Sequence, residues 1–265
     1  MEEQFILVEK KDRVGTIIFN RPERRNALSP LLLFQFAETL TRLQEEGEVR
    51  CLVVRGSGDK AFSSGYDISD IPTNLTPEMA EAFKAKNPIR MGLQAIIHFP
   101  YPVIAMINGH VFGAGCDLAV ACDLRIVVEN AQMGIPPAKL GIIYQPDGIL
   151  RLINIVGLAN AKEILFTGRT FGARQAKEMG LVHYVIPPDQ LSQFTYELAQ
   201  EISENSPLSL KGMKLIFNKL LEPQKLGPED RQEIEALRVQ AFNSEDLKEG
   251  QRAFKEKRKP VFKGK

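Results

Sequence analysis

The sequence predicts an α/β fold with a largely parallel sheet, followed by a mostly helical C-terminal region. Short apolar runs at residues 51–54, 102–107 and 124–128 have the length and the turn-forming boundaries of buried strands. Segments with helical spacing lie between these runs, as expected for strand–helix–strand crossovers. Beyond about residue 147, apolar residues recur mostly at helical spacing. An α/β core with a helical extension is therefore expected.

The first elements along the chain are a hairpin and an amphipathic helix. Residues 5–9 and 14–19 have strand character and flank a polar turn at residues 11–13. Ser29 precedes Pro30, which is the pattern of an N-cap before proline at the first helical position. Apolar residues then recur every three or four positions, which predicts a helix to about residue 46.

Later elements can be predicted in the same way. The pair Thr76 and Pro77 indicates the start of another helix. A small-residue stretch directly after the 102–107 strand should open a further helix. In the C-terminal region, helical spacing is found at residues 190–203, 208–221 and 229–242.

Composition excludes several classes of function. The chain has 265 residues, is 44% hydrophobic and carries a formal net charge of +1, so no global charge favours nucleic acid or an acidic membrane. No apolar run approaches the length of a membrane span, and the acidic first residues do not resemble a signal peptide. We therefore expect a soluble, cytoplasmic protein.

Cysteine and histidine usage favours neither disulfides nor a metal site. Cys51, Cys116 and Cys122 lie inside apolar segments, which is typical of small buried side chains in a reducing compartment. The three histidines are scattered without metal-ligand spacing. We expect no metal.

Two segments rich in small residues each follow a predicted strand. They are residues 62–68 (FSSGYDI) and residues 108–117 (NGHVFGAGCD). Small residues let a ligand approach the main chain closely. Two peptide N–H groups at adjacent strand ends could therefore converge on one ligand oxygen. Glycine-rich turns alone are weak evidence, because most of them are only turns.

These two segments resemble the signature regions of the crotonase superfamily, the enoyl-CoA hydratase/isomerase group. Residues 20–29 (NRPERRNALS) resemble the first motif of that family, and residues 256–260 (EKRKP) resemble its usual C-terminal ending. Four motifs in the family's order, spread over nearly the whole chain, make the resemblance specific.

The resemblance implies a spiral of β-β-α turns. It implies a core at residues 1–198 that contains the CoA-binding and active sites, and a helical region at residues 199–265 that mediates trimers, often paired into hexamers. It also implies an acyl-CoA substrate and no cofactor other than the coenzyme A that the substrate carries.

The same resemblance places an oxyanion hole at the N–H of Tyr66 and the N–H of Ala114. A thioester carbonyl oxygen bound there would gain negative charge as an enolate forms. One fixed donor at such a position typically lowers a barrier by roughly 3–4 kcal/mol. The Tyr66 side chain would shape the acyl pocket, or it is simply a packing aromatic.

The remaining residues that the resemblance assigns would bind coenzyme A or line the acyl pocket. A solvated loop is the alternative for the arginines, and a solvated tail is the alternative for the lysine. The assigned residues are Arg24, Arg25, Ser64, Gly65, Tyr66, Asp67, Ile68, Ala114, Pro136, Pro137 and Lys257.

Two positions bear on the reaction. Adding water to an enoyl-CoA needs an acid and a base, and hydratases use two carboxylates. The first family position is filled here by Asp117, which is shorter than the usual Glu, and the second is Pro137, which has no side-chain proton to exchange. This departure argues against ordinary hydration and against a double-bond shift. Asp117 could also serve only to satisfy backbone donors near a helix start.

The pattern is most similar to the methylmalonyl-CoA decarboxylase branch of the family. That branch shares Pro137 and the tyrosine of residues 141–144 (GIIY), and further matches lie at residues 87–90, at 99–100 and in the C-terminal segment that begins at residue 244. Decarboxylation needs an oxyanion hole and a pocket that turns the carboxylate out of the thioester plane, but no base. Tyr144, and less directly Tyr66, would orient that carboxylate. A surface-packing role for Tyr144 is the alternative.

Three hypotheses therefore remain. The leading one is decarboxylation of a methylmalonyl-CoA-type thioester. The second is hydration or isomerisation of an enoyl-CoA with Asp117 as the acid and base. The third is a non-catalytic CoA- or RNA-binding homologue, although the near-neutral charge argues against RNA.

Overall fold

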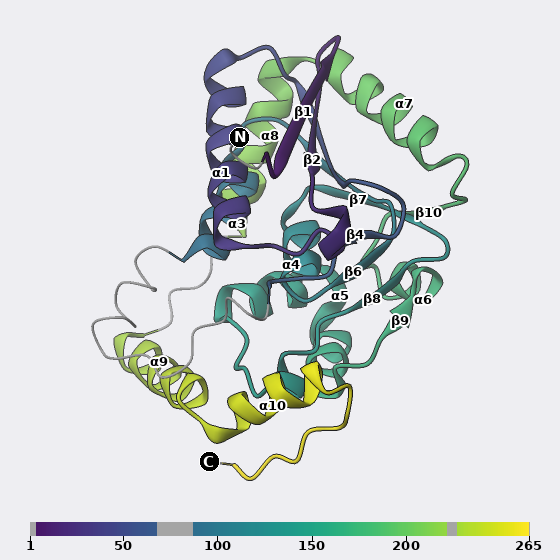
Figure 1. The fold of residues 1–265 in the computed structure, drawn as a ribbon. Coiled ribbons are helices and arrows are strands. Elements are labelled where there is room, and N and C mark those ends of the chain that lie inside the picture. The colour runs from purple at the N-terminus through teal and green to yellow at the C-terminus, as the bar shows by residue number, and fades with distance from the viewer. Residues whose placement is uncertain (1–3, 68–86, 222–226, 265) are drawn as a thin grey trace. The chain divides into compact units, whose positions relative to one another are not determined.

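The computed structural model describes residues 4–67, 87–221 and 227–264. The described chain forms two compact units (Figure 1). The first unit contains residues 4–67, 88–134 and 170–221. The second contains residues 87, 135–169 and 227–264.

A six-stranded sheet forms the centre of the first unit. In chain order its strands are β1 (Ile6–Lys11), β2 (Val14–Phe19), β3 (Cys51–Gly56), β5 (Val103–Ile107), β7 (Leu124–Val128) and β10 (Tyr184–Ile186). They lie in the order β1-β2-β3-β5-β7-β10, and every pair except the β1–β2 hairpin is parallel. The predicted hairpin, the predicted buried strands and the largely parallel sheet are confirmed.

A second sheet in the same unit was not predicted from the sequence. Its strands are β4 (Ala61–Ser63), β6 (His110–Phe112), β8 (Gln132–Gly134) and β9 (Phe171–Gly172), in that spatial order. Only the β8–β9 pair is antiparallel. The residues predicted to supply the functional amides, Tyr66 and Ala114, follow β4 and β6, so the geometry of this sheet positions them.

Helices cover the first unit. They are η1 (Pro22–Arg24), α1 (Pro30–Glu46), α3 (Pro88–His98), α4 (Ala114–Ala121), α6 (Ala173–Glu178), α7 (Leu191–Glu204) and α8 (Pro207–Leu220). Helix α1 packs on α3, α3 packs on α4, and α7 lies across β2, β3, β5 and β7. The predicted cap of α1 is confirmed, because the Ser29 Oγ accepts a hydrogen bond from the Leu32 N–H.

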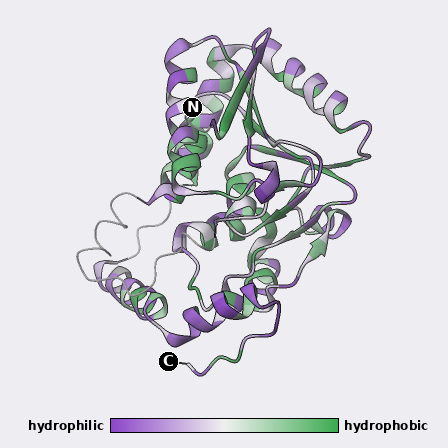
Figure 2. Cartoon of the chain, in the orientation of Figure 1, coloured by the Kyte–Doolittle hydropathy of each residue, from purple (hydrophilic) through white to green (hydrophobic). Residues whose placement is uncertain are grey.

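Three phenylalanines form a buried link between the large sheet and the second sheet. The ring of Phe19 in β2 packs edge to face on Phe36 of α1, with centroids 5.2 Å apart, and on Phe62 of β4, with centroids 5.6 Å apart. All three rings are fully buried. The central strands of the large sheet are correspondingly coloured mainly as hydrophobic in Figure 2. This packing fixes β4, and with it the start of the first functional segment.

The second unit is mainly helical. Its elements are η3 (Pro137–Leu140), α5 (Pro146–Thr167), α9 (Pro228–Phe242) and α10 (Glu245–Lys255). Helix α10 packs on η3 so closely that a Cβ on Gly250 would lie 2.7 Å from the Leu140 carbonyl oxygen. The mostly helical C-terminal region is therefore confirmed. The helix start predicted at Thr76 and Pro77 lies outside the described residues.

Within the described ranges, no helix combines the length and the apolar character that crossing a membrane requires.

A buried arginine holds the C-terminal end of α4. Arg125 is only 5% exposed, and its guanidinium donates to the carbonyl oxygens of Cys122 at 2.6 Å and of Leu181 at 2.7 Å. It also donates, over longer distances, to the carbonyls of Ala119 and Val120. The last turn of α4 thus has its unpaired carbonyls satisfied by a cation, which also interacts favourably with the helix dipole.

His183 contacts the same arginine through the backbone. The Arg125 N–H donates to the His183 Nδ1 at 3.1 Å, so this nitrogen carries no proton. Burial, and secondly the positive charges of Arg125 and Lys177, lower the pKa of His183 from 6.5 to about 4. As the pH falls, the unfolded chain takes up a proton on His183 near pH 6.5, whereas the folded state takes it up only near pH 4. The folded state therefore loses stability as the pH falls from about 6.5 toward 4.

We predict that the substitution His183→Asn reduces this acid sensitivity. The asparagine can keep an acceptor near the Nδ1 position but does not titrate. In the unmodified protein, the free energy of unfolding should fall between pH 7 and pH 4.5. In the variant this fall should be smaller by about 1 kcal/mol, a value that allows for partial solvent screening of His183. Thermal unfolding across this pH range is the measurement. Parallel curves for the two proteins would contradict the role assigned to His183.

Candidate functional site

The two glycine-rich segments lie side by side, backbone against backbone. Strand β4 runs into the first segment, β6 lies within the second, and the two strands are parallel neighbours. A Cβ added to Gly65 would lie 2.8 Å from the Phe112 carbonyl oxygen and 3.6 Å from the Ala114 nitrogen. Gly65 also has φ of +96°, so both its conformation and its surroundings require glycine. The two predicted donor segments are therefore adjacent in the fold.

The hydrogen bonds around Tyr66 define the direction of its peptide group. The Leu28 N–H donates to the Gly65 oxygen at 2.8 Å, and the Asp67 N–H donates to the Leu28 oxygen at 3.0 Å. Tyr66 is the central residue of this parallel bridge. A residue in that position directs its own N–H to the opposite side of its strand. The Tyr66 N–H thus points away from Leu28.

The second donor lies at the N-terminus of a helix. Ala114 is the first residue of α4 and follows Gly113, which has φ of +51°. The first N–H groups of a helix have no acceptor within it, and they lie at the positive end of its dipole. Gly113 is itself held by its N–H, which donates to the Gly134 oxygen at 2.8 Å. This environment suits an amide that binds a growing negative charge.

Asp117 lies in the first turn of the same helix and is 6% exposed. Its N–H donates to the Gly113 oxygen at 3.2 Å, which is the first backbone bond of α4. Its position is compatible with both predicted roles, the proton relay and the helix-start carboxylate.

Asp67 joins the two motifs that were predicted to bind coenzyme A. Its Oδ2 lies 3.1 Å from the Arg24 guanidinium and 3.7 Å from that of Arg21. Ser64 makes a further link, since its N–H donates to the Arg25 oxygen at 2.9 Å and its Oγ to the Arg24 oxygen at 3.3 Å.

The exposures of these residues differ. Arg24 keeps 55% of its side chain exposed, and Arg25 is also exposed, so both can reach a ligand phosphate, whereas Asp67 is largely covered. Ile68, also predicted to bind the substrate, lies outside the described residues.

Sequence reasoning missed a set of buried amides that hold these loops. The Asn26 side chain, 1% exposed, donates to the Ala61 oxygen at 2.8 Å and accepts from the Arg21 N–H at 3.1 Å. Asn108 acts similarly on the turn after β3: its Nδ2 donates to the Gly58 oxygen at 2.7 Å and its Oδ1 accepts from the Gly56 N–H at 3.0 Å.

Two further positioning residues were also missed. The Ser63 Oγ accepts from the Gly65 N–H at 3.1 Å, and Ser63 is fully buried. Arg21, besides its approach to Asp67, donates to the Ala27 oxygen at 2.8 Å and lies over the Phe5 ring. Ser63 and Asn108 each directly follow an apolar run, and this was a usable signal because buried polar groups must find partners. Arg21 and Asn26 lie in a mostly polar motif that gave no such signal.

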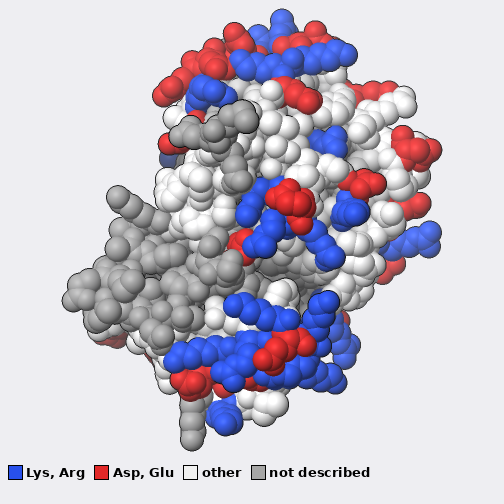
Figure 3. Space-filling model, viewed as in Figure 1, with Lys and Arg blue, Asp and Glu red and all other residues white. Residues whose placement is uncertain are grey.

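Four predicted site residues belong to the second unit. Pro136 and Pro137 begin η3, and Tyr144 lies between η3 and α5. Lys257 follows α10, has φ of +53° and is exposed. Figure 3 shows other Lys and Arg side chains gathered over α10 and the tail that follows it. A phosphate group would be attracted to that surface.

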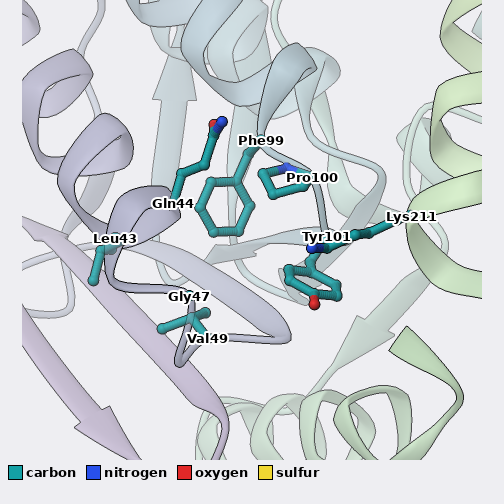
Figure 4. Close-up of a pocket in the computed structure, with 8 residues that line it drawn as sticks. All are labelled: Leu43, Gln44, Gly47, Val49, Phe99, Pro100, Tyr101 and Lys211. Atoms are coloured by element: carbon teal, nitrogen blue, oxygen red, sulfur yellow. The ribbon is translucent and has the colours of Figure 1, made fainter. Parts of the chain in front are cut away.

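A separate cavity of about 230 Å³ contains none of the predicted site residues (Figure 4). It lies where the end of α1, the connection from α3 to β5 and α8 meet. Its one charged group, Lys211, is already placed over the Tyr101 ring at 4.8 Å. The cavity is lined by Leu43, Gln44, Gly47, Val49, Phe99, Pro100, Tyr101 and Lys211.

The three cysteines are poor candidates for nucleophiles. All are buried and free, as predicted. Burial raises the pKa of each thiol to about 12, so the reactive thiolate is scarce near neutral pH. Cys116, although it lies in the second signature segment, packs its sulfur against the Val111 carbonyl oxygen.

Comparison with known proteins identifies the family of this chain. The sequence model of the enoyl-CoA hydratase/isomerase family matches residues 9–265. The putative enoyl-CoA hydratase/isomerase YngF of Bacillus subtilis is 35% identical over 264 residues, covering all of both chains.

Two solved structures are also similar. Methylmalonyl-CoA decarboxylase in complex with 2-nitronate-propionyl-CoA has a TM-score of 0.92 and 32% identity, covering 99% of both chains. An enoyl-CoA hydratase from Bacillus anthracis has a TM-score of 0.76 and 34% identity, covering 99% of this chain and 100% of the other.

The fold and the matching family model define this protein as an acyl-CoA enzyme of the crotonase type. The chain belongs to the enoyl-CoA hydratase/isomerase family.

We predict that Asn26→Ala loosens both signature loops. The substitution leaves the Ala61 oxygen and the Arg21 N–H without their side-chain partner, and it places alanine at φ of +54°, which asparagine tolerates better. The free energy of unfolding should fall by about 3 kcal/mol. Chemical denaturation is the measurement. Asn20→Ala, which removes one bond at the protein surface, is the control and should cost much less.

Proposed function

We propose that this protein decarboxylates a methylmalonyl-CoA-type thioester, binding the enolate oxygen between the backbone amides of Tyr66 and Ala114. The observation that carries the proposal is the close approach of the two donor segments at Gly65 and Phe112. Each amide that is fixed before the reaction can lower the barrier by roughly 3–4 kcal/mol, because it need not reorganise as charge develops.

The choice of decarboxylation rests on the chemistry available at the second carboxylate position. Pro137 begins η3 there, and its side chain can neither give nor accept a proton. In a decarboxylation, the bond between the α-carbon and the carboxylate breaks, CO2 leaves, and the electron pair moves to the thioester oxygen. The α-carbon then takes a proton from water, with Asp117 as the proposed relay. No base is needed to start this sequence.

Tyr144 is proposed to orient the departing carboxylate. A neutral hydroxyl can hold the carboxylate out of the thioester plane through one hydrogen bond. A cation in the same place would stabilise the negative charge of the substrate, which is lost on going to CO2, and would therefore raise the barrier. Tyr66 contributes the wall of the acyl pocket.

The similarity to the decarboxylase structure supports this choice. Its ligand, 2-nitronate-propionyl-CoA, contains a planar anionic group attached to a CoA thioester, as the proposed enolate does. In the proposed complex, Ser64, Gly65, Asp67, Ile68, Pro136 and Pro137 line the thioester and pantetheine, and Arg24, Arg25 and Lys257 bind the phosphates. The proposed reaction uses no cofactor beyond the coenzyme A of the substrate.

We predict that the purified protein converts methylmalonyl-CoA to propionyl-CoA and CO2. Tyr144→Phe should lower kcat by about 10- to 100-fold, because the variant lacks one hydrogen bond to a charged group and such a bond contributes a free energy of that size to the barrier. Product masses from a panel of malonyl-type and enoyl-type thioesters are the measurement. An unmodified protein that turns over no malonyl-type thioester would rule out the proposal.

A second candidate, hydration of an enoyl-CoA, is favoured by the buried Asp117 on α4. The same panel separates the two. Rapid hydration of crotonyl-CoA that Asp117→Asn abolishes would establish hydration. Salt-dependent RNA binding without acyl-CoA binding would instead support the non-catalytic alternative.

We also propose that the protein assembles into trimers, or hexamers built from them, through α8. The polar side of this helix faces its own unit: the Lys214 Nζ donates to the Tyr101 oxygen at 3.0 Å and to the Asp123 Oδ2 at 2.7 Å, and the Asn218 Nδ2 donates to the Ile97 oxygen at 2.7 Å. The apolar residues are exposed instead, which is the reverse of an ordinary surface helix. They are Leu208, Met213, Leu215, Ile216, Phe217, Leu220 and, just after the helix, Leu221.

An exposed apolar surface of this kind marks an interaction site. We predict that the double substitution Leu208→Glu, Leu220→Glu shifts the protein from a trimer or hexamer to a monomer, because two charges would be buried between copies. Light scattering after gel filtration measures the mass. Leu31→Glu, at a leucine of α1 that is 54% exposed, is the control and should leave the mass unchanged.

A further inference from the structure

We infer that Gly148 is a positioning residue for Tyr144. The inference rests on the proposed decarboxylation, in which the hydroxyl of Tyr144 orients the carboxylate. Both residues belong to the second unit, and four positions separate them across the start of α5. Neither the sequence motifs nor the proposed mechanism gives Gly148 a role.

The Tyr144 ring occupies the space that a side chain at position 148 would take. A Cβ built on Gly148 would lie 2.8 Å from the Tyr144 Cε1 and 3.4 Å from both Cδ1 and Cζ. Gly148 is buried, while Tyr144 is partly exposed. The edge of the ring is therefore in contact with the backbone of the first turn of α5.

The local backbone does not explain the glycine. Gly148 lies within the first turn of α5, which begins at Pro146, and it is not among the glycines with positive φ. Alanine is favoured over glycine at helical positions, so a glycine here is costly unless something must pack against it. The Tyr144 ring is the group that packs there.

Close glycine contacts also fix the chain that leads to Tyr144. A Cβ on Gly141 would lie 3.0 Å from the Asp246 carbonyl carbon, and one on Gly168 would lie 3.2 Å from the Pro136 Cα. Together with the packing of Gly250 on Leu140, these contacts hold η3 between α5 and α10. The backbone before Tyr144 is held in this way, so the position of the Tyr144 hydroxyl depends mainly on the side-chain torsion angles of Tyr144. Contact with Gly148 restricts these angles.

A methyl group at position 148 would move the ring rather than unfold the protein. The nearest atoms to it belong to the outer part of a side chain that can rotate. We therefore expect Gly148→Ala to fold normally but to hold the hydroxyl in the wrong place. A shift of about 1 Å in a catalytic geometry can reduce the rate roughly 100-fold.

The first experiment is kinetic, with methylmalonyl-CoA as substrate. Gly148→Ala should lower kcat by roughly 10- to 100-fold and change KM much less, since CoA binding is proposed to rely on other residues. In the Tyr144→Phe background, where the hydroxyl is already absent, Gly148→Ala should lower kcat by less than about twofold. Gly172→Ala is the control, because its methyl group would meet only the Gln132 Nε2, at 3.7 Å, and it should leave kcat unchanged.

The second experiment observes the ring directly and needs no activity. The chain has five tyrosines, so protein labelled with 3-fluorotyrosine should give five 19F resonances, and the Tyr144 signal is the one that Tyr144→Phe removes. Gly148→Ala should shift that signal, and Gly172→Ala should not.

The outcomes separate this inference from the proposed function. An unmoved Tyr144 signal, or equal rate losses in the two backgrounds, would overturn the positioning role and leave the decarboxylation standing. An unmodified protein without decarboxylase activity would overturn the proposed function. The 19F shift of the Tyr144 signal in Gly148→Ala would then be the measurement that shows whether Gly148 positions the Tyr144 ring.

Discussion

The close packing of two backbone segments is the constraint on which the rest of the site depends. Gly65 and the residues from Phe112 to Ala114 approach so closely that no side chain fits at position 65. A hydrogen bond from Leu28 fixes one segment and the start of α4 fixes the other. Buried amides of Asn26 and Asn108 hold the surrounding turns. The candidate site is thus built from main-chain geometry, so a few changed side chains could adapt the same fold to different thioester reactions.

The side chains around the proposed enolate site would decide which reaction it performs. An enolate can form by removal of a proton, by addition of a nucleophile or by loss of CO2. Each of these routes requires different side chains next to the reacting carbon. The family resemblance places Pro137 at one of the two acid–base positions and the short, buried Asp117 at the other, and Tyr144 follows η3, which begins at Pro137. In the decarboxylation that we propose, no acid or base has to transfer a proton before the enolate forms.

The sequence predicted the hairpin, α1, the long buried strands and the start of α4, because each has a strong local pattern of apolar spacing or capping. It did not reveal β4, β6, β8 and β9, which have two or three residues each and depend on partners distant in the chain. Similarly, the segments of Tyr66 and Ala114 could be predicted from family motifs. The contacts of Asn26, Ser63 and Gly148 could not, since they depend on tertiary packing.

Helix α4 is held at both ends, and this has a consequence for the energetics of the site. Its first residue contributes a proposed donor, and the buried guanidinium of Arg125 binds the carbonyls of its last turn. Because both ends of the helix are held, α4 would shift little if a ligand became anionic at its first residue, as we propose. The anion would then form in a nearly constant electric field, because the helix dipole would not have to reorient as the charge develops.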